Sequence, residues 1–241
     1  MKERYRNAVT YGFHKVDYRG EITDLNLDWM KVKLEGLEGI SILKTSLIGD
    51  YNLLNILAAI AMVKELGEDI RELPEKLKKL DFVEGRMQRI EERGIKVIVD
   101  YAHTEDALES VLKTLTKCSY KKLYTLISGT GERYAEKRPR LAEISEKYSD
   151  YTMVSSNSPR DEDPMKIALE VAAGFKNARY STYDIEVDRT KAIRKLVAQA
   201  QSGDIILLTG KGHENYQEIK KVKKEYKEIE VVEKALKSKI Y

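Results

Sequence analysis

The spacing of apolar residues changes along the chain, with the break near residue 84. Before it, the pattern predicts strands and helices at 8–13, 29–34, 52–66 and 70–80. The helix over 52–66 is apolar on most sides, so it is expected to be largely buried, and Gly67 is expected to end it. The first 48 residues therefore predict a strand-rich piece that leads into a buried helix.

After residue 84, short apolar runs alternate with amphipathic stretches of about 11 residues, typical of β-α repeats. The predicted strands are 95–99, 123–127, 151–154, 184–187 and 205–208. The predicted helices are 105–116, 135–148, 164–175, 190–200 and 231–237, the fourth of them capped by Asp188. This alternation predicts an α/β fold with a doubly wound, mostly parallel sheet. The Lys/Glu-rich run 220–234 is interpreted as a solvated tail and helix face.

Polar and glycine-rich loops follow four of the predicted strands. These loops are 100–104, 128–133, 155–160 and 210–214, and they hold two of the three histidines of the chain. In a doubly wound sheet, ligands bind beyond the carboxyl ends of the strands. The sequence therefore predicts that these loops share one ligand site.

Composition narrows the class of protein. Lys plus Arg total 43 against 40 Asp plus Glu, which leaves a formal charge of +3, and 42% of the residues are hydrophobic. The charges are interleaved and form no basic stripe, so no nucleic-acid partner is expected. The sequence has no apolar run of membrane-spanning length and no secretion signal at its N-terminus, so no membrane partner and a cytoplasmic location are expected. Cys118 is the single cysteine, which excludes an internal disulfide and a cysteine zinc site.

Five short motifs, taken in order, resemble the Mur ligase family, and most closely its MurE type, which adds the third amino acid of the peptidoglycan stem. They are 85–88 (GRMQ), 100–108 (DYAHTEDAL), 137–139 (KRP), 157–160 (NSPR) and 210–214 (GKGHE). The resemblance covers nearly the whole chain. It implies that residues 1–83 are a remnant of the central ATP-binding domain. Residues 84–241 then correspond to the C-terminal, amino-acid-binding domain, which is Rossmann-like.

A phosphate-binding loop of the Gly-x-x-Gly-Lys-Thr/Ser type is absent from the sequence. The segment 129–132 has glycines but lacks the lysine and hydroxyl residue that would hold phosphates and magnesium. The family's carbamylated lysine and upstream metal ligands are missing too. The chain is therefore expected to be inactive alone and to need the N-terminal part of the ligase as a partner, and no metal ligand is assigned within it.

The resemblance implies a nucleotide site made by Asn52, Asn55, Arg86, Asp100 and His103. An amide suits an adenine edge, an arginine fork matches phosphate oxygens, and a carboxylate at a strand end accepts from ribose hydroxyls. Structural alternatives stay open for three of them: Asn52 as a helix N-cap, Arg86 in a surface salt bridge, and His103 as a loop residue or cap.

The amino-acid site is assigned to Arg133, Ser158, Arg160, Gly210 and Glu214. The arginines would bind carboxylates, and Glu214 would accept from the distant ammonium of a diamino acid. Diaminopimelate-adding relatives read Asp-Asn-Pro-Arg where this chain has 157–160; the retained Pro-Arg favours an acceptor with a second carboxylate, such as meso-diaminopimelate or lanthionine. For Lys211, the alternative to a ligand role is simple charge balance with Glu214, and for His213 it is packing in the loop.

The function implied is an ATP-dependent acid–amino-acid ligase that uses ATP and Mg²⁺ and acts on UDP-MurNAc-L-Ala-D-Glu through an acyl phosphate. Two other classes stay open. The chain could be a non-catalytic module or split half that binds an amino acid or nucleotide. It could also belong to a related ligase, of the folylpolyglutamate or cyanophycin synthetase type.

Overall fold

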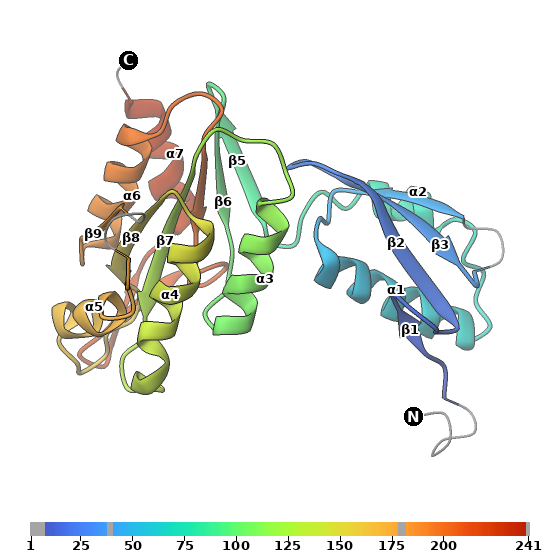
Figure 1. Ribbon diagram of the computed structural model, residues 1–241, viewed down its shortest axis with the longest axis horizontal. Helices are drawn as coiled ribbons and strands as arrows, with labels where there is room; N and C mark the ends of the chain where they lie inside the picture. The colour runs from blue at the N-terminus through green and yellow to red at the C-terminus, as the bar shows by residue number, and fades with distance from the viewer. Residues whose placement is uncertain (1–7, 38–40, 178–181, 240–241) are drawn as a thin grey trace. The chain divides into compact units, whose positions relative to one another are not determined.

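The computed structural model describes residues 8–37, 41–177 and 182–239 (Figure 1). It separates into two compact units along the chain. The first unit comprises Met1–Phe82 with Lys117–Ser119, and the second comprises Val83–Thr116 with Tyr120–Tyr241. Each unit has its own sheet and its own helices, so each is described by itself.

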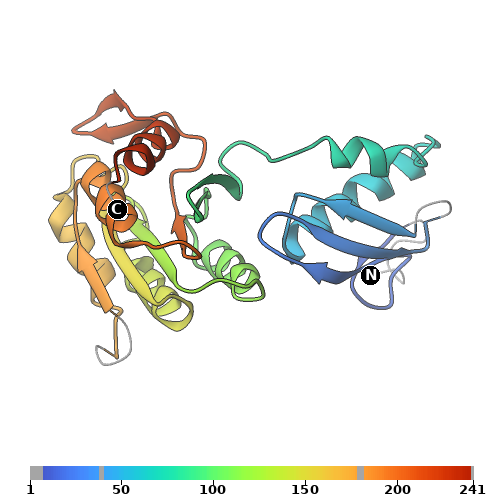
Figure 2. The same ribbon diagram turned by 90° about the horizontal axis from the view of Figure 1, so that it is seen from above.

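The first unit is a four-stranded sheet with one long helix against it (Figure 1; Figure 2). Its elements are β1 (Tyr11–Gly12), β2 (Tyr18–Leu25), β3 (Met30–Glu35), β4 (Ile42–Thr45), α1 (Asp50–Glu65) and α2 (Leu73–Lys78). The strands lie in the order β1-β2-β3-β4, with β2, β3 and β4 antiparallel and β1 parallel to β2. Alternate residues of β3 are buried, as one covered face requires. Gly20 permits close packing, because a Cβ there would lie 2.8 Å from a methyl of Leu53 on α1.

The second unit is a six-stranded sheet covered on both faces. Its strands are β5 (Gln88–Glu92), β6 (Ile95–Val99), β7 (Leu123–Gly129), β8 (Tyr151–Ser156), β9 (Thr182–Ile185) and β10 (Ile205–Leu208). The order is β5-β6-β10-β7-β8-β9, and every pairing is parallel except that of the edge strand β5. The predicted α/β, doubly wound fold is thereby confirmed.

Helices cover this sheet in two groups (Figure 1). One face carries α3 (Glu105–Leu115), α4 (Arg138–Tyr148) and α5 (Pro164–Ala172); the other carries α6 (Arg189–Gln199) and α7 (Glu228–Ser238). The apolar residues of α6 and α7 pack with those of β6, β7, β8 and β10 in one buried cluster. Asp188 caps α6 as predicted, since its carboxylate accepts from the amide of Lys191 at 3.1 Å. The predicted helix 135–148 is instead a 3₁₀ turn, Ala135–Lys137, followed by α4.

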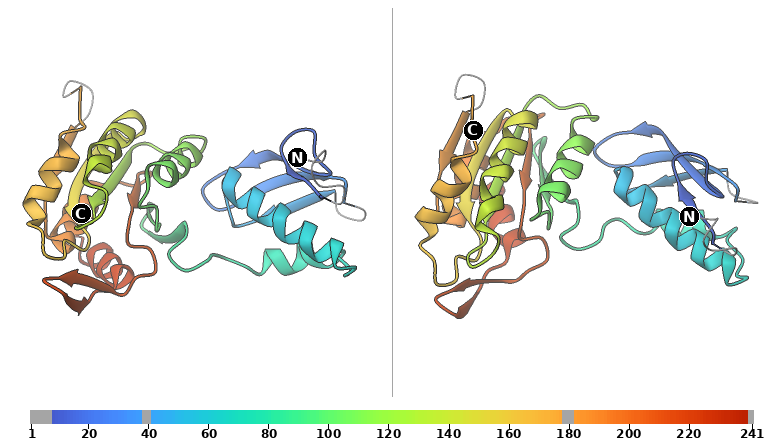
Figure 3. Two further views of the ribbon diagram at one scale, coloured as in Figure 1. Left: turned by 90° about the horizontal axis from the view of Figure 1, so that it is seen from below. Right: turned by 60° about the horizontal axis from the view of Figure 1, so that its bottom comes forward.

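The Lys/Glu-rich run near the C-terminus is largely exposed and continues into a helix, as interpreted, but the hairpin in its first part was not predicted. Its first part lies in a hairpin formed by β11 (Tyr216–Ile219) and β12 (Val222–Glu225), shown in red in Figure 3. The helix α7 then begins at Glu228, three residues before the predicted start. All four residues of β12 are exposed, so no alternation of apolar and polar residues marked the strand.

No helix in the described parts of the chain combines the length and the apolar character that crossing a membrane demands.

Candidate functional site

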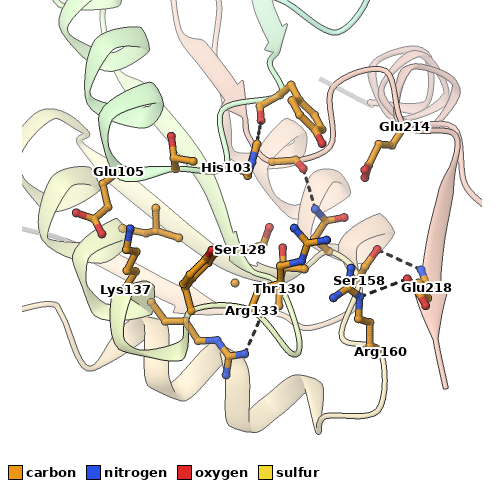
Figure 4. A pocket seen from close by; sticks show the side chains of 18 of the residues that line it. His103, Glu105, Ser128, Thr130, Arg133, Lys137, Ser158, Arg160, Glu214 and Glu218 are labelled. Carbon is orange, nitrogen blue, oxygen red and sulfur yellow. Dashed lines mark hydrogen bonds and ion pairs between the residues drawn. The ribbon is translucent and has the colours of Figure 1, made fainter. Parts of the chain in front are cut away.

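The loops that follow β6, β7, β8 and β10 enclose a pocket of about 300 Å³ at the carboxyl edge of the parallel sheet (Figure 4). Parallel strands place the loops after them on the same edge, so residues distant in sequence meet there. The predicted amino-acid residues all line this pocket: Arg133, Ser158, Arg160, Gly210 and Glu214. The predicted convergence of the four strand-end loops is therefore observed.

Figure 4 shows that the pocket has two ends. Glu214, Ser158, Arg160 and Glu218 lie toward one end, and Glu105 with Lys137 lies toward the other. Acidic and basic side chains are present at both ends. A ligand that carries charges of both signs at both ends would find partners along the whole pocket.

Arg133 and Arg160 differ in their surroundings. Arg133 is exposed, and its guanidinium makes no hydrogen bond or ion pair among the described residues. Arg160 is half-buried: its Nε lies 3.3 Å from a carboxylate oxygen of Glu218, and one terminal nitrogen donates to the carbonyl of Gly131 at 3.3 Å. Arg133 is thus free to move toward a ligand, whereas Arg160 is already held in place.

Glu214 is paired below the pocket surface. The ammonium of Lys211, whose side chain is fully buried, lies 3.2 Å from a carboxylate oxygen of Glu214 and also donates to the carbonyl of Tyr216. Burial lowers the pKa of Lys211, although the nearby Glu214 favours its charged form. The pairing that the charge-balance interpretation of Lys211 requires is therefore present, and this ion pair fixes Glu214 at the pocket wall.

Arg138 holds the loop that carries Arg133, a role that sequence reasoning did not assign. Its side chain is 3% exposed and is bound by Glu162 through two hydrogen bonds of 2.8 Å, by Glu170, and by the carbonyl of Thr130. The Arg138 guanidinium lowers the pKa of Glu162 to about 2. The sequence signal was present in the motif at 137–139, but nothing in it distinguished a structural arginine from a ligand-binding one.

Asn157 was also missed as a pocket residue. It is buried, and its amide nitrogen donates to the carbonyl of Gly210 at 2.7 Å, which joins two of the loops. Its Oδ1 has no hydrogen-bond partner among the described residues. A buried acceptor of this kind is expected to be satisfied by a ligand or water.

The predicted nucleotide residues are more scattered. Asp100 is 4% exposed, and its two carboxylate oxygens accept from the backbone amides of Met87 and Ala102, each at 2.8 Å. Burial raises the pKa of Asp100, and the two amides oppose that rise. Asp100 does not line the pocket; its carboxylate instead links the backbone at Met87 to the backbone at Ala102.

Arg86 and His103 meet at a single tyrosine ring. The guanidinium of Arg86 lies 4.7 Å from the centre of the Tyr101 ring, and the ring of His103 lies 4.7 Å from it on a tilted plane. His103 also places its Nδ1 3.0 Å from the carbonyl oxygen of Tyr101. His103 and Tyr101 line the pocket, so this aromatic and cationic cluster forms part of its rim.

Asn52 and Asn55 belong to the first unit, on helix α1. The N-cap interpretation of Asn52 is wrong: the helix begins at Asp50 with Gly49 as its cap, and Asn52 instead donates from Nδ2 to the carbonyl of Ile48 at 2.8 Å. Asn55 is exposed and lines a small apolar groove between α1 and α2.

No group of three or more histidine, cysteine, aspartate or glutamate side chains is placed to hold a metal ion in the ranges that the structure describes.

Comparison with known proteins gives a consistent result. The protein family described as "Mur ligase, glutamate ligase domain" matches residues 85–212, more than half of the chain. A UDP-N-acetylmuramoyl-L-alanyl-D-glutamate–2,6-diaminopimelate ligase from Aquifex aeolicus is 39% identical over 240 residues, which cover 98% of this chain and 48% of that protein. The ligase of the same name from Syntrophomonas wolfei is 36% identical over 233 residues, covering 96% and 48%. The chain therefore spans about half the length of the curated relatives it matches.

Solved structures agree with this likeness. A structure of a UDP-N-acetylmuramoyl-L-alanyl-D-glutamate–2,6-diaminopimelate ligase superimposes with a TM-score of 0.68 at 32% identity, covering 95% of this chain and 47% of that one. The MurF ligase from Thermotoga maritima in complex with ADP gives a TM-score of 0.69 at 20% identity, covering 98% and 50%, which supports the fold alone.

Proposed function

Because the chain belongs to the Mur ligase family, we propose that it is the acceptor-binding part of an ATP-dependent ligase of peptidoglycan precursor synthesis. The observation that carries the proposal is the pocket itself, in which Arg133, Arg160 and Glu214 arrive from three different loops. Relatives named as 2,6-diaminopimelate ligases match along nearly the whole chain. The proposed acceptor is a diamino acid with a second carboxylate, such as meso-diaminopimelate.

The reaction proposed for the whole ligase has two steps. ATP transfers its terminal phosphate to the D-glutamate carboxylate of UDP-MurNAc-L-Ala-D-Glu, giving an acyl phosphate and ADP. The neutral amine of the diamino acid then attacks the acyl carbon, and the tetrahedral intermediate expels phosphate to leave an amide. Pocket side chains would orient the amine for this attack, and such positioning lowers the barrier because the reacting groups no longer need to find each other.

Charge complementarity supports the assignment of the acceptor. An arginine fork gives bidentate recognition of a carboxylate, and two arginines line this pocket. Glu214, held by Lys211, would accept from the distal ammonium. Ser158 stands where an asparagine is expected, and its hydroxyl already accepts from the amide of Glu218 at 3.1 Å. Ser158 therefore contributes mainly through loop position.

The nucleotide is proposed to bind along the rim formed by Arg86, Tyr101 and His103. Asn52 and Asn55, on α1 of the first unit, stay predicted nucleotide contacts. Residues 1–83 are proposed to be the end of the central ATP-binding domain, and the remaining half of the relatives' length would supply the phosphate loop and the magnesium ligands. Asp100 would act on the nucleotide indirectly, by holding the loop of Tyr101. The cytoplasm remains the proposed location of this activity.

Ligand titration of the chain and two variants tests the proposal. Loss of a charge-assisted hydrogen bond costs about 1.5 to 3 kcal/mol, so Arg160→Ala should weaken meso-diaminopimelate binding at least about tenfold. Affinity for ATP should stay unchanged. Arg140→Ala is the matched control, since Arg140 is exposed on α4 and pairs with Glu143 outside the pocket. Equal loss of both ligands in Arg160→Ala, or no binding of meso-diaminopimelate by the wild-type chain, would contradict the proposed division of sites.

A non-catalytic binding module is the second candidate, favoured by the absence of a phosphate loop from the sequence. A phosphate-release assay on the chain with all three substrates separates the two. Turnover by the chain alone would reject the binding module, and turnover only on addition of the ATP-binding half would support the ligase.

A further inference from the structure

Glu218 on β11 contacts Ser158 and Arg160, the two residues of the loop after β8 that are predicted to bind the acceptor amino acid. Its backbone amide donates to the hydroxyl of Ser158 at 3.1 Å, and its backbone carbonyl accepts from the amide of Arg160 at 3.0 Å. Its carboxylate lies 3.3 Å from Nε of Arg160. Glu218 lines the pocket beside these residues (Figure 4). One residue of the hairpin therefore fixes the loop by three separate contacts.

These contacts constrain how Arg160 presents its guanidinium. The backbone of Arg160 has a positive φ of 54°, which a non-glycine residue adopts when its surroundings hold it there. Lys220, in the turn directly after β11, supplies a second backbone bond, from its amide to the Arg160 carbonyl at 2.8 Å. Of the five guanidinium N–H donors, the Nε donor faces Glu218 and one terminal donor faces Gly131. Among the described residues, the remaining terminal donors have no hydrogen-bond partner, so they are available to a ligand in the pocket.

We propose that Glu218 is a positioning residue that holds Arg160 ready for the distal carboxylate of the acceptor. This inference rests on the proposed function, because it assigns Arg160 to that carboxylate. A long arginine side chain loses rotamer freedom when it binds, and an ion pair that has already fixed the chain removes part of that cost. Glu218 thereby favours an acceptor with two carboxylates over one with a single carboxylate.

Glu218 could instead weaken binding of the ligand, so the sign of its effect on affinity tests the proposal. A carboxylate next to Arg160 also offsets its positive charge and could compete with the ligand. Both partners are mostly covered, with side chains 21% and 27% exposed, so neither effect is abolished by solvent. If competition outweighs positioning, removal of Glu218 tightens binding of a dicarboxylate ligand. The sign of the change therefore distinguishes the two.

The experiment measures the affinities of meso-diaminopimelate and L-lysine for the 241-residue chain and its variants. L-Lysine lacks the distal carboxylate, so it reports on the rest of the pocket. Glu218→Ala should weaken meso-diaminopimelate binding about fivefold, as expected for the loss of a modest ion pair, and leave L-lysine unchanged. Glu218→Gln keeps an acceptor for Nε and should recover most of the loss. Glu225→Ala, on the exposed strand of the same hairpin, should behave as wild type.

A double-variant comparison then shows whether Glu218 acts through Arg160. In an Arg160→Ala background, Glu218→Ala should have no further effect on meso-diaminopimelate binding. Unchanged or tighter binding in Glu218→Ala, or an equal loss for both ligands, would overturn the positioning role. Wild-type protein that fails to bind meso-diaminopimelate would instead defeat the proposed function of the pocket, so the two failures are distinguishable.

Discussion

The two units place their polar side chains by different rules. In the second unit, parallel strands deliver loops to one edge, and residues separated by more than 80 positions line one pocket. In the first unit, β2, β3 and β4 form an antiparallel meander, and the two candidate ligand residues sit on one helix. Topology therefore makes a shared site predictable from sequence in the second unit but gives no such guide in the first.

The largest effect is expected from breaking a buried ion pair of the second unit, which tests whether the two units also differ in stability. Arg189 and Glu228 have fully buried side chains, and Arg189 also donates to the carbonyl of Thr209 at 2.8 Å and to Ser128 at 3.4 Å. Arg189→Met leaves Glu228 buried without its partner, which should destabilise the second unit by about 3 to 5 kcal/mol. Urea unfolding followed by far-UV circular dichroism measures the change.

Trp29, the single tryptophan, provides the control because it lies in the first unit. All the partners of Arg189 named above are in the second unit. The fluorescence transition of Trp29 should therefore keep its midpoint in Arg189→Met. A parallel shift of both transitions would mean that the units unfold together, and the contrast between them would then not extend to stability.

A smaller effect is expected from the ion pair that holds the loop of Arg133. The folded pKa of Glu162, about 2, lies below its ordinary value of 4.5 because Arg138 binds the carboxylate. Its contribution to stability is therefore complete above about pH 4.5 and is lost as the pH falls toward 2. Glu162→Gln should lower the free energy of unfolding by about 1 to 2 kcal/mol at neutral pH. It should also make the free energy of unfolding depend less on pH between 4.5 and 2. Unfolding midpoints of both proteins, measured between pH 6 and pH 2, check this prediction. If the midpoint of the variant falls with pH as steeply as that of the wild type, other carboxylates cause the acid sensitivity.

In the second unit, the sequence predicted the helices and the central strands because their apolar patterns are strong, whereas β2 and β4 of the first unit were not predicted. Residues 205–208 are a continuous apolar run, residues 95–99 are apolar except for Lys96, and both segments are buried strands. The edge strand β5 and the hairpin β11–β12 were missed since their polar residues carry no period. Edge strands are stabilised by pairing on one side, and sequence alone does not show which partner they find.

The candidate site shows the same limit at the level of single side chains. Loop position predicted that Arg133, Arg160 and Glu214 would meet, and they do. The partner of Arg160 could not be predicted, because Glu218 lies on the hairpin that was missed. Asp100 was assigned to a ribose, but its burial and its two backbone donors depend on the folded path of residue 87. Residue type and loop position thus indicate which residues gather, while tertiary contacts decide what each one does.

The smallest predicted effect separates the two asparagines of α1. The Asn52 side chain donates to the carbonyl of Ile48, a bond that fixes the approach to the helix, whereas Asn55 is exposed. Asn52→Ala should destabilise the first unit by about 1 kcal/mol, the typical net value of one hydrogen bond, and Asn55→Ala should leave its stability unchanged. The midpoint of the Trp29 fluorescence transition in urea measures the stability of both variants.

ATP titration of the same two proteins then shows whether either amide also contacts the nucleotide. If Asn55→Ala weakens ATP binding at constant stability, a single helix in the first unit carries one structural and one ligand-binding amide three residues apart. If Asn52→Ala leaves the midpoint unmoved and weakens ATP binding, the bond to Ile48 is dispensable for stability, and the Asn52 amide serves nucleotide binding instead.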